Sequence, residues 1–174
     1  IEFNPARVKE YRLVGYENRI LNDEDLVQTT LYFKFYLIQA MKEAGLADNY
    51  LGILDEWKEM ISMGLTTFAE TPEPTRSDCH AWSASPNYHF LSLLSGIEPA
   101  SPGFKTVKIE PHPGPLKELE CKIVHPKGEI LVELERKGKK GITGKIIIPE
   151  GLPGRFVWRD QEIVLSSGSN KIDL

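Results

Sequence analysis

The sequence predicts an α+β protein, helical up to residue 98 and an antiparallel β-sandwich from residue 99 onward. Two observations support this prediction. In the first part, apolar residues recur every three or four positions, which is the period of a helix with one buried face. In the second part they alternate with polar residues between Gly- and Pro-containing turns, as in half-buried strands. We therefore expect domains at residues 27–98 and 99–174, after a separate segment at residues 1–26.

Composition narrows the classes of protein that this chain can be. Its 174 residues are enough for one domain or two small ones, and 41% apolar with 26% charged residues is typical of globular proteins. The net charge is -4, and the only dense basic cluster lies in a glycine-containing turn at residues 136–140, so we expect no nucleic-acid partner. No stretch approaches the ~20 apolar residues of a membrane-spanning helix, so we expect no membrane partner.

Three helices are expected between residues 27 and 98. The first, residues 27–44, is apolar on most of its sides, so we expect it to be buried within a larger helical assembly. The second, residues 48–63, follows a Gly45 turn and forms a helical hairpin with the first. A third covers residues 87–95. The expected buried positions are Leu31, Phe35, Ile38 and Met41 in the first helix, Leu51, Leu54, Trp57 and Ile61 in the second, and Phe90, Leu91, Leu93 and Leu94 in the third.

Alternation of period two then marks a series of short strands. Turn residues separate them at the spacing of a β-sandwich. The strands are expected at residues 104–110, 119–124, 129–136, 145–148, 155–158 and 161–165.

The loop between the second and third helices, residues 65–86, holds the strongest candidate site. Its prolines exclude a continuous helix, yet it contains Glu70, His80 and Trp82. A carboxylate near an imidazole and an indole suits sugar chemistry, because glycoside hydrolysis uses carboxyl groups as acid and base. The indole face can pack on the C–H face of a sugar, and imidazole can bind its hydroxyls.

Other site chemistries are disfavoured by the same sequence. A Ser-His-Asp triad from Asp78, His80 and Ser83 or Ser85 lacks the G-x-S-x-G turn of the hydrolases that use one. Zinc binding by Cys79 and His80 lacks a second ligand pair. No phosphate-binding or dinucleotide-binding glycine motif is present. We therefore expect no metal and no cofactor.

The remaining histidines and the two cysteines are interpreted as structural. His89 lies between aromatic residues on the third helix, and His112 and His125 precede prolines at strand ends. Cys79 and Cys121 are expected to be buried free thiols, a single disulfide between them being the alternative.

From about Val27 to the C-terminus the chain resembles the C-terminal part of bacterial α-L-rhamnosidases, inverting glycoside hydrolases built on an α/α toroid. Three motifs carry the resemblance. They are W-K-E-M-I-S-M-G-L-T-T-F-A-E (residues 57–70), S-D-C-H-A-W-S-A-S-P (residues 77–86) and G-I-E-P-A-S-P-G-F-K-T-V-K-I-E-P-H (residues 96–112). The resemblance implies a few helices from the end of such a toroid, followed by a C-terminal antiparallel β-sandwich.

The resemblance also implies site roles and a partner. Glu70, which ends the T-T-F-x-E motif, would be the catalytic general base, with His80 and Trp82 binding the substrate. The family usually has Trp where this chain has Ala69, so the pocket wall is expected to differ. The partner would be a rhamnose-containing glycoside. The general acid of the family lies upstream of the matching region, so we expect this chain to be inactive alone.

The resemblance leaves the cellular location open. It suggests a bacterial periplasmic or extracellular enzyme, with the cytoplasm as the alternative.

Residues 1–26 do not fit the rhamnosidase pattern. The string F-N-P-A-R-V-K-E-Y-R-L-V-G-Y-E-N-R (residues 3–19) resembles a segment of bacterial von Willebrand factor A-type domain proteins. The D-x-S-x-S metal-dependent adhesion motif is absent, so no adhesive role is implied. The chain is expected to be a junction of two unrelated fragments.

Two other classes of function remain as alternatives. The β-rich part could be a non-catalytic accessory or carbohydrate-binding module, in which case Trp158 would be exposed. The chain could also be an interaction protein organised by its N-terminal segment. In addition, the apolar surface of the helix at residues 27–44 predicts self-association if it lacks neighbours.

Overall fold

The structure is a computed structural model that describes residues 27–71 and 74–174. It divides after Ser85 into two compact units, which are treated separately below. The expected domain boundary after residue 98 stays a prediction, and the expectations for residues 1–26 lie outside the described residues. None of the helices in the described ranges is long and apolar enough to cross a membrane.

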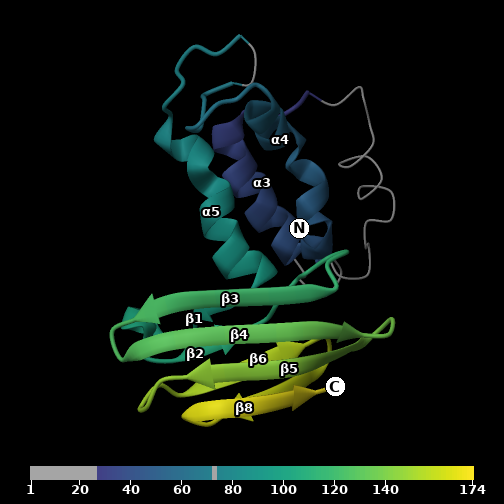
Figure 1. Cartoon of the computed structure of the whole chain (residues 1–174), viewed down its shortest axis with the longest axis vertical. Coiled ribbons are helices and arrows are strands. Elements are labelled where there is room, and N and C mark those ends of the chain that lie inside the picture. The colour runs from purple at the N-terminus through teal and green to yellow at the C-terminus, as the bar shows by residue number, and fades with distance from the viewer. Residues whose placement is uncertain (1–26, 72–73) are drawn as a thin grey trace, which may run out of the picture. The chain divides into compact units, whose positions relative to one another are not determined.

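In the described part of the first unit, the first helix is α3, Leu31–Glu43 (Figure 1). It starts four residues later than the apolar pattern suggested, because the Thr30 side chain accepts a hydrogen bond from the backbone N–H of Phe33 and caps the helix. The predicted stripe is largely confirmed, with Leu31, Ile38 and Met41 buried. The expectation that the helix is buried on most sides is wrong, since a face with Tyr32, Phe33 and Tyr36 is exposed.

The expected second helix is two helices in the structure. A 3₁₀ helix, η1 (Ala47–Ile53), is followed by α4 (Asp55–Ser62), with a non-helical Leu54 between them. Leu54 and Trp57 are buried as predicted. Within α4, Met60 is buried in place of Ile61, which is 74% exposed. The expectation for Ile61 is therefore wrong.

The expected third helix is also composite. The residues expected to form it lie in α5 (Ser85–His89) and the π-helical turn η3 (Phe90–Leu94), and the 3₁₀ turn η2 (Ala81–Ala84) precedes them. In the π turn the backbone N–H of Ser95 bonds to the carbonyl of Phe90, five residues back. The wider turn rotates the helix surface, so Leu93 and Leu94 are buried while Phe90 and Leu91 are exposed. The predicted burial of Phe90 and Leu91 is therefore wrong.

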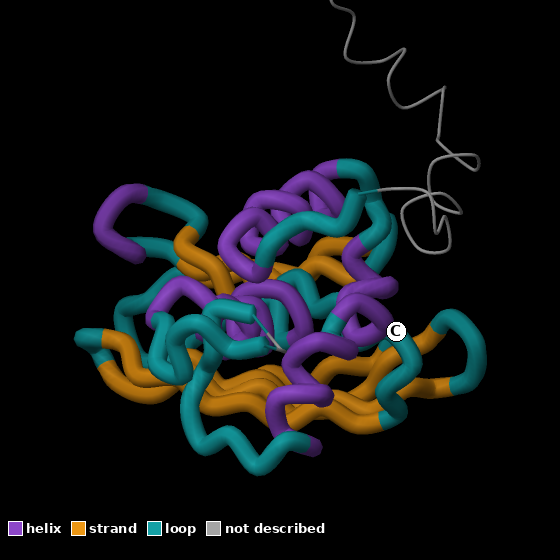
Figure 2. The backbone as a smooth tube through the Cα atoms, turned by 90° about the horizontal axis from the view of Figure 1, so that it is seen from above, coloured by secondary structure: helices purple, strands orange, loops and turns teal. Residues whose placement is uncertain are grey.

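The second unit contains two four-stranded sheets (Figure 1). Figure 2 shows the strands in orange. The first sheet has the order β1 (Ile97–Pro99), β2 (Val107–Ile109), β6 (Gly154–Trp158) and β7 (Gln161–Leu165). The second has the order β3 (Glu118–His125), β4 (Gly128–Lys137), β5 (Gly141–Ile148) and β8 (Gly168–Asp173).

The pairing is antiparallel except between β2 and β6, which run parallel, so the expectation of a purely antiparallel sandwich is corrected at this pair. The three strands β3–β5 separate β2 from β6 in the chain, which leaves ample length for a parallel crossover. The single strand expected at residues 104–110 is shortened to β2. Before it lies the 3₁₀ turn η4 (Pro102–Phe104), in which Gly103 and Phe104 both have positive φ.

The core of the second unit is built from alternate residues of both sheets. It is dominated by branched aliphatic side chains, with Ile109, Ile130, Val132, Ile142, Ile146, Ile148, Phe156 and Ile172 among its most buried members. His125 is also buried, and both of its ring nitrogens are hydrogen-bonded: Nε2 to the carbonyl of Phe104 at 2.9 Å and Nδ1 to the backbone N–H of Lys127 at 3.1 Å. This confirms the structural interpretation of His125.

Candidate functional site

The loop at residues 65–80 folds back on itself and thereby places Glu70. The backbone N–H of Glu70 donates to the carbonyl of Ser77 at 2.9 Å, and that of His80 donates to the carbonyl of Phe68 at 2.6 Å. The Thr67 hydroxyl also donates to the carbonyl of Asp78. These bonds bring two residues ten positions apart, Glu70 and His80, to the same end of the loop.

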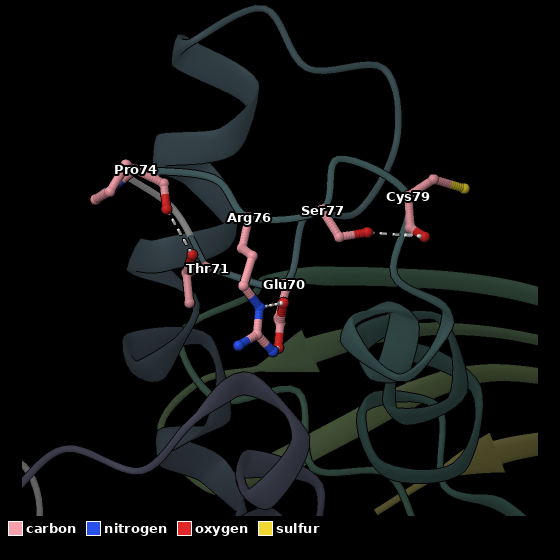
Figure 3. Close-up of polar contacts among 6 residues, drawn as sticks. All are labelled: Glu70, Thr71, Pro74, Arg76, Ser77 and Cys79. Atoms are coloured by element: carbon pink, nitrogen blue, oxygen red, sulfur yellow. Dashed lines mark hydrogen bonds and ion pairs between the residues drawn. The ribbon is translucent and has the colours of Figure 1, made fainter.

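The Glu70 carboxylate is held by Arg76 in a two-point ion pair (Figure 3). Arg76 Nε donates to Oε2 at 2.7 Å, and Nη2 donates to Oε1. The Glu70 side chain is 19% exposed and that of Arg76 82%. The hydrogen bonds and the charge of Arg76 lower the pKa of Glu70, with a smaller contribution from the charge of His80. Glu70 is therefore an ionised carboxylate at neutral pH, as a general base must be.

His80 and Trp82 lie beside each other at the start of η2. Their ring centroids are 4.5 Å apart in an edge-to-face arrangement. His80 Nε2 is buried and has no hydrogen-bond partner among the described residues. Trp82 is 54% exposed, and its other neighbour is the ring of Tyr32 on α3, 5.0 Å away. The arrangement presents part of an indole to a ligand, beside an imidazole nitrogen that is enclosed and unpartnered among the described residues.

Trp57 on α4 fixes the turn that carries these two rings. Its Nε1 donates to the carbonyl of Ser83 at 2.7 Å in a buried hydrogen bond. Lys34 of α3 lies 5.6 Å from the centre of the Trp57 ring and forms an ion pair with Glu56 at 2.5 Å. Three elements of the first unit, α3, α4 and η2, are thus connected through one indole.

A small apolar pocket lies on the Tyr32 side of Trp82. Its volume is about 280 Å³, and it is lined by Tyr32, Phe35, Ala81, Trp82, Ala84 and Ser85. Sequence reasoning missed this pocket and the ion pair between Arg76 and Glu70. The pocket depends on the packing of η2 on α3, which no sequence pattern encodes. The ion pair was indicated in the sequence only by an arginine six residues after the glutamate.

The structure also bears on the alternative chemistries. Ser83 is completely buried, which makes it a poor nucleophile for an external substrate. Cys79 and Cys121 are both free thiols; Cys121 is buried as expected, but the expectation for Cys79 is wrong because it is exposed. Within residues 27–71 and 74–174, no three His, Cys, Asp or Glu side chains are grouped so that they could hold a metal ion.

Ala69, where the resembled family usually has Trp, is completely buried. An indole at this position would not fit without rearrangement of the loop.

In the β-sheets of the second unit, the two aromatic residues Phe156 and Trp158 are turned inward. Trp158 is only 5% exposed, and its Nε1 donates to the carbonyl of Lys140 at 2.8 Å. The guanidinium groups of Arg136 and Arg159 lie 5.5 and 5.6 Å from the centre of its ring. Phe156 is fully buried. This is the arrangement of a structural sandwich, and it counts against the carbohydrate-binding module.

Comparison with known proteins gives matches to two different families. Residues 96–172 match the family described as the bacterial alpha-L-rhamnosidase C-terminal domain. Residues 1–31 match a different family, described as the C-terminal region of the uncharacterized protein YfbK. No curated protein sequence matches the chain.

Solved structures with the same fold include several rhamnosidases. An α-L-rhamnosidase of Aspergillus terreus is 19% identical with a TM-score of 0.80, over 91% of this chain and 21% of that one. A GH78 family rhamnosidase of Bacillus sp. GL1 is 27% identical with a TM-score of 0.72, over 83% and 17%. An α-L-rhamnosidase of Streptomyces avermitilis, complexed with L-rhamnose, is 17% identical with a TM-score of 0.68, over 80% and 17%. The chain thus spans about a fifth of the length of these proteins.

Proposed function

We propose that this chain is the C-terminal part of an α-L-rhamnosidase that releases terminal α-L-rhamnose with inversion, and that Glu70 is its general base. The observation that carries the proposal is the Glu70 carboxylate, held by Arg76 on the loop that leads through His80 into Trp82. The family match of residues 96–172 and the rhamnosidase fold of the solved structures support the same enzyme class.

In the proposed mechanism, Glu70 takes a proton from a water molecule as that water attacks the anomeric carbon. Inverting enzymes also need a carboxylic acid, about 6.5–9.5 Å from the base, to protonate the departing oxygen. We assign that acid to the part of the enzyme that this chain does not contain. The chain is therefore expected to be inactive alone.

His80 and Trp82 would bind the sugar in this proposal. The buried, unpartnered Nε2 of His80 can form a hydrogen bond with a rhamnose hydroxyl, and leaving it unpaired costs about 1–3 kcal/mol. The exposed part of Trp82 can cover the apolar C–H face of the ring.

Titration with L-rhamnose, followed by NMR of the indole N–H protons, tests the binding proposal. The chain has three tryptophans, and two of them are internal controls, because Nε1 of Trp57 and of Trp158 is already bonded to a backbone carbonyl. We expect a saturable shift of the Trp82 signal only. His80→Ala should weaken the response, whereas His112→Ala, at a half-buried histidine of the second unit, should not.

The choice of sugar provides a further control. D-Mannose, a pyranose of similar size, should shift the Trp82 signal less at the same concentration. Equal shifts with both sugars, or equal binding by the His80→Ala variant, would contradict the proposed site.

We further propose that residues 1–26 have an origin separate from the rest of the chain. The match of residues 1–31 to a family other than the rhamnosidases supports this. The β-sandwich, with its buried Trp158, is then a structural C-terminal domain of the enzyme.

A further inference from the structure

We infer that Arg76 is a positioning residue for Glu70, which fixes the plane of the carboxylate. The inference rests on the proposed role of Glu70 as the base. It goes beyond that role by assigning a function to a residue that neither the motifs nor the comparisons single out.

The geometry is that of a guanidinium fork on a carboxylate. Nε and Nη2 of Arg76 each donate to a different oxygen of Glu70. Two parallel N–H···O bonds define a plane, which a single bond or a point charge does not. Backbone pairing next to the fork, from the N–H of Glu70 to the carbonyl of Ser77 and from the N–H of His80 to the carbonyl of Phe68, sets the distance between the two side chains.

The fork leaves the base able to act. A carboxylate has about four lone-pair directions on its two oxygens, and the fork uses two of them. Each oxygen therefore retains one direction that can accept a hydrogen bond from water. The ion pair with Arg76 makes Glu70 a weaker base, because a cation beside a carboxylate favours its ionised form.

Two groups on the same loop, Arg76 and His80, act on the charge of Glu70, and both lower its pKa. Arg76 is the stronger of the two because it combines hydrogen bonds with charge. Removal of Arg76 should therefore raise the pKa of Glu70, even with His80 in place.

Carboxyl NMR of the whole chain, labelled with ¹³C-glutamate, tests the inference. The Glu70 signal is identified by its absence in Glu70→Gln. In the wild type we expect a titration below the ordinary glutamate range and side-chain couplings of a single rotamer. Arg76→Gln should shift the titration upward and average the couplings. Arg76→Lys should recover part of the pKa shift, since it keeps the charge, but not the fixed rotamer.

Arg155→Gln is the matched control, because it removes an arginine that pairs with Glu162 in the second unit. It should leave the Glu70 signal unchanged. An unchanged pKa of Glu70 in Arg76→Gln would overturn the inference, and full recovery of the single rotamer in Arg76→Lys would overturn the role of the fork. If Glu70 behaves as expected but L-rhamnose does not shift the Trp82 indole, the proposed function fails while the action of Arg76 on Glu70 stands.

Discussion

At the scale of single residues, the first unit buries a phenol that links its stability to alkaline pH. Tyr50 on η1 is 1% exposed, and this burial raises its pKa above the ordinary tyrosine value. As pH rises past about 10, the unfolded chain releases the phenol proton while the folded chain retains it. The stability that depends on the neutral phenol is therefore lost as pH rises from the unfolded pKa toward the folded one.

Tyr50→Phe should remove this alkaline loss. The free energy of unfolding of the wild type should fall by up to about 1.4 kcal/mol per pH unit above pH 10, and that of the variant should fall less steeply. Urea unfolding followed through the Trp57 indole signal measures the difference. Tyr88→Phe, at an exposed tyrosine, is the control and should keep the wild-type slope. Equal slopes for wild type and Tyr50→Phe would contradict the assignment.

The sequence predicted some of the candidate site residues and missed others. Glu70, His80 and Trp82 could be named because they stand in motifs that resemble a known family. The contact of Arg76 with Glu70 could not, because it depends on how residues 65–80 fold back. Met60, rather than the expected Ile61, is the next buried residue after Trp57 on α4, because a spacing of three and a spacing of four are both compatible with one face of a helix.

At the scale of elements, the β3–β4 hairpin carries an unfavourable charge pattern on one face. Glu118 lies directly opposite Glu135, and Glu120 opposite Glu133. Lys145 pairs with Glu133 at 2.8 Å and relieves the second pair. Like charges directly across a strand pair are destabilising by a few tenths of a kcal/mol, so the first pair is a site for stabilisation.

Glu118→Lys should stabilise the second unit by about 0.5 kcal/mol, because it places an ammonium opposite Glu135. Urea unfolding followed through the Trp158 signal measures the gain, which should shrink at high salt. Glu150→Lys makes the same change in net charge at an exposed turn outside the sheets, and should leave stability almost unchanged. A gain of the same size in both variants would point to net charge rather than to the cross-strand pair.

Strands of the second unit were easier to predict than helices of the first. The alternation through β4, with Ile130, Val132 and Leu134 inward, is direct evidence of a half-buried strand. By contrast, β1 and β8 were missed because one has only three residues and the other contains few apolar ones. The parallel pairing of β2 with β6 depends on chain topology, which no local pattern encodes.

At the scale of the whole molecule, the exposed aromatic face of α3 predicts self-association. Tyr32, Phe33 and Tyr36 are exposed together on one helix, in ring contact with each other. Contiguous apolar patches of this kind are rare on monomeric proteins. We propose that a second copy of the chain covers this face at high concentration.

Phe33→Glu should reduce this association, because it places a charge within the aromatic patch. Sedimentation velocity over a range of concentrations should show dimers for the wild type and a larger monomer fraction for the variant. Val164→Glu, at an isolated exposed valine on β7, is the control and should associate like the wild type. A wild type that stays monomeric throughout would contradict the prediction.

We propose that this chain carries the base of a two-carboxyl enzyme whose acid lies in another part of that enzyme. The most direct test of this proposal is the hydrolysis of methyl α-L-rhamnoside by the chain alone, with Glu70→Gln assayed in parallel. An alkoxide must be protonated as it departs, and the proposed acid lies outside this chain, so we predict that neither protein releases rhamnose faster than buffer. Turnover by the wild type that Glu70→Gln abolishes would contradict the proposal, because both catalytic groups would then have to lie within this chain.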